Sequence, residues 1–125
     1  MKVEEIMKRA IAVEEIKLKE AAEIMSEKRV GSLIIMRGEN IVGIITERDV
    51  LKNVGRLNEK ISKIMSKDVI TISPDSSLDD AAKTMTENEI KRLPVVEKGK
   101  LVGIITATDL IANSDALNEN FFLED

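Results

Sequence analysis

The chain has 125 residues, of which 43% are hydrophobic and 34% charged, with a formal net charge of −4 at pH 7. Cysteine and histidine are absent, which excludes disulfides, thiolate nucleophiles, zinc sites and imidazole bases. No run approaches the roughly 20 apolar residues that cross a bilayer, and the amino terminus is acidic rather than signal-like, so we expect a cytoplasmic protein. The acidic balance gives no bulk attraction to nucleic acid. Richness in Lys and Glu without Cys favours a thermophilic source.

The dominant feature of the sequence is an internal repeat. Residues 41–51, IVGIITERDVL, return at 101–111 as LVGIITATDLI. Ile6-Met7 returns as Ile64-Met65 at a slightly shorter spacing, so the second half carries a short insertion around 68–78. A repeat of fixed period indicates duplicated structural units. We therefore expect one unit at 1–58 and one at 59–125, sharing a hydrophobic core because each alone would be marginal in size.

Each half begins with an apolar stretch that predicts a strand, clearly at 69–72 and less clearly at 10–13. A short amphipathic helix follows, because Leu, Ala and Met recur at helical spacing over 18–25 and again over 78–85. The second helix has the stronger start signal. Ser-Pro-Asp-Ser-Ser at 73–77 precedes two aspartates whose charge suits the positive end of a helix dipole.

Two β-rich runs separated by a glycine-containing turn come next, and they predict hairpins over 32–45 and 93–105. The strands are apolar on both faces, so we expect them to be buried. Each hairpin enters a second helix, at Thr46 or at Thr106. The unit is therefore strand–helix–strand–strand–helix, twice, which is an α+β (mixed α/β) fold, and a short polar linker around 55–59 joins the copies.

The motif Gly-Ile-Ile-Thr-x-x-Asp places Thr46 before Asp49 and Thr106 before Asp109, at a strand-to-helix junction. One interpretation is structural, with each Thr as the N-cap and each Asp as its capping-box partner. The other is functional. The helix N-terminus and the Thr hydroxyl suit a phosphate, while a carboxylate one turn on can accept hydrogen bonds from a ribose diol. The residues leave both interpretations open, and the two are compatible.

These features resemble a tandem pair of cystathionine β-synthase (CBS) domains, and the resemblance covers nearly all of the chain. It rests on the Ile-Met near the start of each half, VITISPD at 69–75, KRLPVV at 91–96, VGSLII at 30–35 and both Gly-Ile-Ile-Thr-x-x-Asp motifs. The resemblance implies two units packed pseudo-symmetrically through their sheets, with clefts for adenosine-type ligands. In this family the motif Asp holds the ribose, the Ser or Thr contacts phosphate, and adenine lies against apolar side chains of the first two strands.

The resemblance carries over onto the matching positions of this chain. In the second half the expected ligand-binding residues are Thr106, Asp109, Ile70, Thr71, Pro74, Arg92, Leu93 and Pro94. In the first half they are Thr46, Arg48, Asp49, Ser32, Leu33 and Ile34.

The two halves differ at charged positions. Arg48 can grip a phosphate bidentately, whereas its counterpart is Thr108. Conversely, Arg92 matches Ser32. The first half also has Glu14 and its neighbouring acid in place of the second half's Ser-Pro-Asp lead-in, and such acids repel phosphate. We therefore favour one good site per chain.

The leading hypothesis is a regulatory module that binds an adenine nucleotide or adenosyl ligand, with Mg²⁺ only alongside phosphate, and acts on an effector protein in trans. By resemblance we expect a homodimer. The alternative is a structural dimerisation module with vestigial clefts. An enzyme is not expected, because no nucleophile–base pair or phosphate loop is present. Nor do we expect a membrane partner or nucleic-acid binding, since the chain has no Trp or Tyr for stacking. Phe121 and Phe122 in the tail suggest docking onto the core or onto a second protomer.

Overall fold

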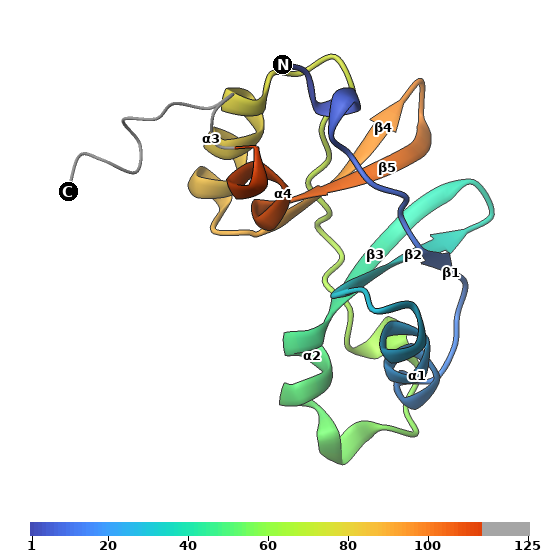
Figure 1. Ribbon diagram of the computed structural model, residues 1–125. Helices are drawn as coiled ribbons and strands as arrows, with labels where there is room; N and C mark the ends of the chain where they lie inside the picture. The colour runs from blue at the N-terminus through green and yellow to red at the C-terminus, as the bar shows by residue number, and fades with distance from the viewer. Residues whose placement is uncertain (114–125) are drawn as a thin grey trace. The chain divides into compact units, whose positions relative to one another are not determined.

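The computed structural model describes residues 1–113 (Figure 1). The prediction for the tail that contains Phe121 and Phe122 lies outside these residues. Within the described range, no helix combines the length and the apolar character that a membrane span requires.

The elements follow the repeat in the sequence. The first copy contains β1 (Ala12–Val13), α1 (Leu18–Lys28), β2 (Ser32–Arg37), β3 (Asn40–Thr46) and α2 (Glu47–Lys52). The second contains α3 (Leu78–Asn88), β4 (Arg92–Glu97), β5 (Lys100–Thr106) and α4 (Ala107–Ala112). Short 3-10 turns lie at η1 (Val3–Glu5), η2 (Val54–Arg56) and η3 (Ile61–Lys63). Both amphipathic helices and both hairpins are therefore confirmed.

The chain forms two compact units that are not its two continuous halves. One unit consists of Ala10–Val69, and the other combines Met1–Arg9 with the chain from Ile70 onward. The first segment of each sequence repeat thus packs with the opposite repeat. η1, in Met1–Arg9, belongs to the unit of β4 and β5, whereas η3 belongs to the unit of β2 and β3. The boundary predicted at 58/59 separates the two copies of the sequence repeat, not the two packed units, and it remains a prediction about the repeat.

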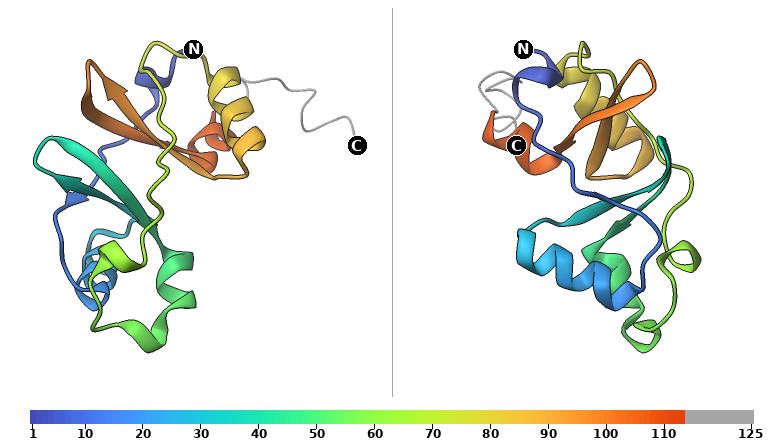
Figure 2. Two further views of the ribbon diagram at one scale, coloured as in Figure 1. Left: turned by 180° about the vertical axis from the view of Figure 1, so that it is seen from behind. Right: turned by 90° about the vertical axis from the view of Figure 1, so that its right-hand side faces the viewer.

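Each unit places two helices beside one hairpin. In the Ala10–Val69 unit, α1 contacts α2 and both lie against the β2–β3 hairpin (Figures 1 and 2). In the other unit, α3 and α4 pair in the same way beside β4 and β5. Both hairpins are antiparallel and in the same register, so that Ser32 lies opposite Thr46 and Arg92 lies opposite Thr106.

Of the two strands predicted at the start of the repeats, only the one with the weaker sequence signal forms. β1 forms at Ala12–Val13, parallel to β2, and Ile34 donates its backbone N–H to the Ile11 carbonyl. The clearer prediction, at 69–72, is wrong as a strand: only an isolated bridge between Ile72 and Val95 forms there. The position that corresponds to Ile34 is Pro94, which has no N–H to donate, so the ladder cannot extend back along this segment.

The buried hydrophobic residues form a separate cluster in each unit, which corrects the expectation of one shared core. One cluster is Leu18, Ala21, Met25, Leu33, Ile35, Ile45 and Ile61. The other is Val3, Ile72, Leu78, Ala81, Met85, Leu93, Val95, Ile105 and Leu110. Val3 and Ile61 occupy equivalent places, so the exchanged segments complete the two cores.

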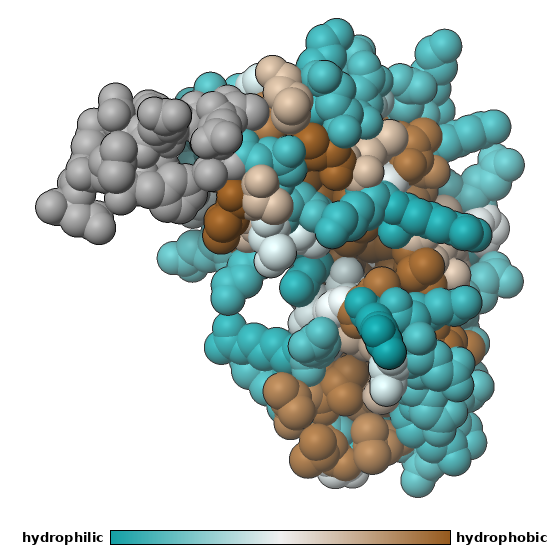
Figure 3. Space-filling view, viewed as in Figure 1, coloured by the Kyte–Doolittle hydropathy of each residue, from teal (hydrophilic) through white to brown (hydrophobic). Residues whose placement is uncertain are grey.

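A few large hydrophobic side chains remain outside these clusters. Leu51 on α2 is 73% exposed and Val54 on η2 is 63% exposed, and apolar side chains gather over α2 and η2 in the lower part of Figure 3. Ile111 on α4, the repeat counterpart of Leu51, is 60% exposed. The same helix face is therefore apolar and exposed in both repeats.

Candidate functional site

The Thr-x-x-Asp motifs form complete capping boxes, which confirms the structural interpretation of these residues. Thr46 accepts a hydrogen bond from the Asp49 N–H at 3.3 Å, and Asp49 Oδ2 accepts from the Thr46 N–H at 2.9 Å. Thr106 and Asp109 repeat this geometry at 3.2 and 2.9 Å. Reciprocal caps of this kind begin short helices that isolated sequence preference would not stabilise.

The Thr hydroxyl donates inside the box rather than outward. Thr46 Oγ1 lies 3.1 Å from Asp49 Oδ2, and Thr106 Oγ1 lies 2.9 Å from Asp109 Oδ2. The next N–H is also occupied, because Ala107 donates to the Lys91 carbonyl at 2.8 Å. The expected phosphate site made of free helix N–H groups and a free Thr hydroxyl is therefore largely satisfied by the protein itself. The negative charge of a ligand phosphate would therefore have to be neutralised by nearby cationic side chains.

The second carboxylate oxygen distinguishes the two units. Asp109 Oδ1 forms an ion pair with Lys8 Nζ at 3.0 Å, and the Asp109 side chain is only 4% exposed. Asp49 is half-buried, and within residues 1–113 it has no such cation within ion-pair distance. Asp49 thus offers Oδ1 to an incoming hydroxyl group, whereas Asp109 Oδ1 is already engaged.

Two predicted residues lie directly beside the motif threonines. Ser32 is 8% exposed and faces Thr46 across the β2–β3 ladder. Arg92, half-buried, faces Thr106 across the β4–β5 ladder. Arg48 is exposed in the first turn of α2. The structure therefore brings a carboxylate and a hydroxyl together in each unit, with a guanidinium on a neighbouring residue.

The apolar residues predicted on the two hairpins are buried. Leu33 and Leu93 belong to the two core clusters and are fully buried, so packing accounts for them. Ile34 and Pro94 are also buried but belong to neither cluster, because alternation along the strand turns them to the other face of the hairpin. Packing in the core clusters does not account for Ile34 and Pro94, yet both side chains are almost fully covered, so a base could reach that face only if it became exposed.

The lead-in residues of the second half separate along the sheet. The parallel bridge between Ile72 and Val95 runs the chain away from the Thr106 end, because Arg92 lies at that end of β4. Ile70 and Thr71 precede the bridge and stay on the Thr106 side. Pro74 lies beyond it, where its carbonyl accepts from the Glu4 N–H at 3.0 Å. Pro74 is therefore not brought together with Thr106 and Asp109.

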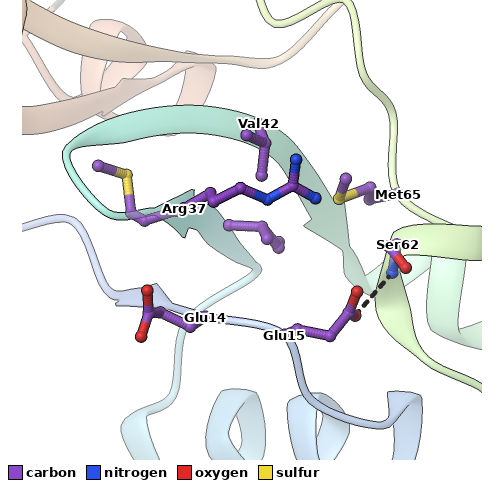
Figure 4. Close-up of a pocket in the computed structure, with 8 residues that line it drawn as sticks. Glu14, Glu15, Arg37, Val42, Ser62 and Met65 are labelled. Atoms are coloured by element: carbon purple, nitrogen blue, oxygen red, sulfur yellow. Dashed lines mark hydrogen bonds between the residues drawn. The ribbon is translucent and has the colours of Figure 1, made fainter.

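A pocket of about 330 Å³ lies elsewhere in the Ala10–Val69 unit, near the turn of the β2–β3 hairpin. Figure 4 shows the Arg37 side chain extending towards Met65, with Glu14 and Glu15 on the other side. Ser62 donates its N–H to Glu15 at 3.1 Å, and hydrogen bonding from Ser62 lowers the pKa of Glu15. No predicted ligand residue lines this pocket, and its two carboxylates would repel a phosphate.

Lys8 is the site residue that the sequence analysis missed. It lies at the far end of the chain from Asp109 and reaches it only because Met1–Arg9 packs into the other repeat's unit. A signal was present, since the Ile-Met motifs align Lys8 with Ser66. At this position one repeat has a charged residue and the other has a hydroxyl. The same difference occurs where Arg48 aligns with Thr108 and where Arg92 aligns with Ser32.

Comparison with known families and proteins gives consistent matches. The family model described as "CBS domain" matches residues 3–56 and 61–115. Among curated relatives, the uncharacterized protein MJ1225 of Methanocaldococcus jannaschii is 42% identical over 115 residues, and its MJ1232 is 36% identical over 106. The matches cover 87% and 83% of this chain but only 41% and 36% of those proteins. The chain thus spans about two fifths of the length of these relatives.

Solved structures match over nearly the whole chain. The CBS domain pair of protein MJ0100, in complex with 5′-methylthioadenosine and S-adenosyl-L-methionine, superposes with a TM-score of 0.86 at 30% identity, covering 94% of this chain and 98% of that chain. The CBS domain protein PAE2072 from Pyrobaculum aerophilum, complexed with AMP, gives a TM-score of 0.87 at 26% identity, covering 95% of this chain and 97% of that chain. Structures similar to this one therefore bind adenosyl ligands.

Proposed function

Because this chain belongs to the CBS domain family, of which it carries a tandem pair, we propose that it is a regulatory module that binds an adenosyl ligand of the adenine-nucleotide class. The observation that carries the proposal is the carboxylate of the Thr-x-x-Asp motif, which recurs once in each unit. In each unit the threonine fixes one carboxylate oxygen. The other oxygen is directly open to ribose hydroxyls at Asp49, whereas at Asp109 it is paired with Lys8, with which a ribose would compete. The adenosyl ligands of the similar MJ0100 and PAE2072 structures support the ligand class.

The remaining ligand contacts follow from the residues beside each carboxylate. We assign the ligand's phosphate to Arg48 in one unit and to Arg92 in the other, because the threonine hydroxyls are used internally. The adenine would lie against the half-buried Ile70 and the exposed Thr71 in the second unit, and contact with Ile34 or Pro94 would require their buried hairpin face to become exposed. Mg²⁺ would enter only with the ligand's phosphates, since no three metal-ligating side chains gather within residues 1–113.

The output of such a module would pass to a partner. A ligand that binds one association state more tightly shifts the equilibrium towards it, and at a hundred times its Kd it stabilises that state by about 2.7 kcal/mol. We propose a homodimer and an effector protein that responds in trans. Leu51 and Ile111 support the homodimer, since the same exposed apolar position recurs in both repeats. Catalysis is not proposed, because the chain has neither His nor Cys to act as base or nucleophile.

The second candidate is a structural dimerisation module without a ligand. The closed capping boxes favour it, because Thr46 and Thr106 are fully explained by starting α2 and α4. On this alternative the carboxylates serve only the helices, and removing them would affect stability but nothing else.

Ligand binding separates the two candidates. The chain has no Trp or Tyr, so a 260 nm band in the spectrum of purified protein reports bound adenine almost free of protein background. Calorimetric titration with AMP would then compare wild type with Asp49→Ala, Asp109→Ala and the double variant. Asp79→Ala, an exposed acid in the first turn of α3, is the control. We expect each site variant to lose one binding event and the control to lose none. Unchanged AMP binding in the double variant would establish the structural alternative.

A further inference from the structure

We propose that Lys8 makes the Asp109 site selective for adenosyl ligands that carry an anionic group. This inference rests on the proposed function, because it names the ligand class that one of the two sites accepts. It concerns a residue outside the repeated motif, contributed to the site by the exchanged segment Met1–Arg9.

The geometry at Asp109 leaves no vacant carboxylate oxygen. Oδ2 accepts from the backbone N–H and hydroxyl of Thr106 at 2.9 Å each, and Oδ1 is paired with Lys8 Nζ at 3.0 Å. The carboxylate is almost completely buried at 4% exposure, whereas the Lys8 side chain is 72% exposed. Lys8 is thus the solvent-exposed member of the pair, and Asp109 is the buried one, fixed by Thr106.

Because Asp109 is only 4% exposed and Lys8 Nζ lies 3.0 Å from Oδ1, a ribose whose hydroxyls bind this oxygen competes with the ammonium group for it. A ligand with a phosphate compensates the displaced Lys8, because the freed ammonium can pair with the phosphate at the same site. A neutral ligand offers no replacement partner, so the full loss of the ion pair counts against its binding. A cationic ligand adds repulsion to that loss. The ion pair thus raises the affinity ratio of anionic to neutral ligands without any contact to the base.

The other unit provides an internal comparison. Lys8 and Ile104 exchange backbone hydrogen bonds at 2.9 Å in both directions, and Ser66 and Ile44 do the same at 3.0 Å. Ser66 therefore occupies the place of Lys8 beside Asp49. Its hydroxyl carries no charge, so a neutral ligand has no ion pair to displace there. Arg48 adds attraction for phosphate in that unit, but it does not block Asp49.

The equivalence of Lys8 and Ser66 suggests a reciprocal exchange. Both residues are exposed and both keep their backbone hydrogen bonds whatever the side chain, so Lys8→Ser and Ser66→Lys should leave the fold intact. Asp49→Ala isolates the Asp109 site, and Asp109→Ala isolates the Asp49 site. The probes are AMP, which is anionic, and 5′-methylthioadenosine, which is neutral, each titrated by calorimetry.

In the Asp49→Ala background we expect Lys8→Ser to tighten 5′-methylthioadenosine binding on the order of fivefold and to weaken AMP binding by a similar factor, as for a partly exposed ion pair. In the Asp109→Ala background, Ser66→Lys should weaken 5′-methylthioadenosine by the same order. If Lys8 acted by general attraction alone, Lys8→Ser would weaken AMP binding and leave the neutral ligand unchanged, and this result would overturn displacement of the Lys8–Asp109 ion pair as the source of the selectivity.

The outcomes also separate this inference from the function on which it rests. If AMP binds but Lys8→Ser leaves the ratio of the two affinities unchanged, the selectivity role of Lys8 is wrong and the proposed function stands. If neither probe binds wild-type protein nor any variant, both fail together. Lys8→Ser in otherwise wild-type protein repeats the measurement without the Asp49→Ala substitution, so a folding defect of that background cannot decide the result.

Discussion

The side chain of Met7 packs directly over Gly103: a Cβ atom at Gly103 would lie 2.8 Å from the Met7 sulfur and 2.9 Å from the Lys8 carbonyl oxygen. Met65 covers Gly43 in the same way in the other unit. The Ile-Met motif and the Gly-Ile-Ile-Thr motif are therefore one structural feature, formed where the exchanged segment crosses the second hairpin strand. The two glycines make room for this segment rather than for a ligand.

Gly103→Ala should destabilise the protein by about 1–3 kcal/mol, as expected for overpacking, because the added methyl group meets the backbone at Lys8. Gly43→Ala should cost less, since the nearest atoms to its Cβ all belong to the flexible Met65 side chain. Urea unfolding of the two variants measures the difference. Equal losses would mean that the backbone approach at Gly103 does not limit the packing.

Thr106→Ala should lower the free energy of unfolding by about 1 kcal/mol, because it removes the side-chain acceptor at the N-cap of α4. Thr46→Ala should act alike on α2. Thr106→Ser is the matched control, since serine keeps the oxygen that accepts from the Asp109 N–H. Thermal unfolding followed by circular dichroism gives the comparison, and a serine variant as unstable as the alanine variant would contradict the capping role.

Arg29→Gly and Glu89→Gly should each stabilise the protein by about 0.5–1 kcal/mol. Both residues end an 11-residue helix in the left-handed region, at φ 55° and 54°, where a side chain is strained and glycine is not. Lys28→Gly, one residue earlier in α1, should destabilise instead because it lies in right-handed helix. Denaturant midpoints decide between these signs.

The Glu15–Ser62 hydrogen bond should give a small acid-dependent contribution to stability. Hydrogen bonding from Ser62 lowers the pKa of Glu15 in the folded protein below its ordinary value of 4.5. Because the folded state favours the carboxylate, the contribution is fully present above pH 4.5 and is lost as the pH falls through the lower folded pKa. Glu15→Gln should therefore flatten the fall in unfolding free energy below pH 4.5. Ser62→Ala removes the hydroxyl but keeps the backbone N–H that Glu15 accepts, so it should flatten the fall only in part. A Glu15→Gln profile parallel to wild type would contradict the assignment.

Leu51→Glu combined with Ile111→Glu should shift the proposed homodimer to monomer, because it introduces charge at two exposed apolar positions that correspond in the repeat. Sedimentation velocity measures the association state. Lys52→Glu changes the charge of the same helix without touching an apolar side chain, so it should leave the dimer in place. A wild-type protein that sediments as a monomer would remove the homodimer from the proposal.

Local elements were predictable because their signals are local. The spacing of Leu, Ala and Met predicted α1 and α3, and β-rich apolar runs on either side of a glycine-containing turn predicted both hairpins. The spacing of Thr and Asp three residues apart predicted the capping boxes. The strand predicted at 69–72 failed for a reason outside the segment itself: its neighbour in space, Pro94, has no N–H to donate.

The sequence by itself determined the duplication, the family resemblance and the repeated carboxylate motif, since each of these is carried by residues close together in the chain. Only the tertiary structure decided which segments share a unit: Val3 and Ile61 are completely buried in the core of the opposite repeat, where their apolar surface is removed from water. That exchange brings Lys8 to Asp109 and places Ser66 at the equivalent backbone position beside Ile44 in the other unit. Two motifs with nearly the same sequence therefore have different charged groups around their carboxylates.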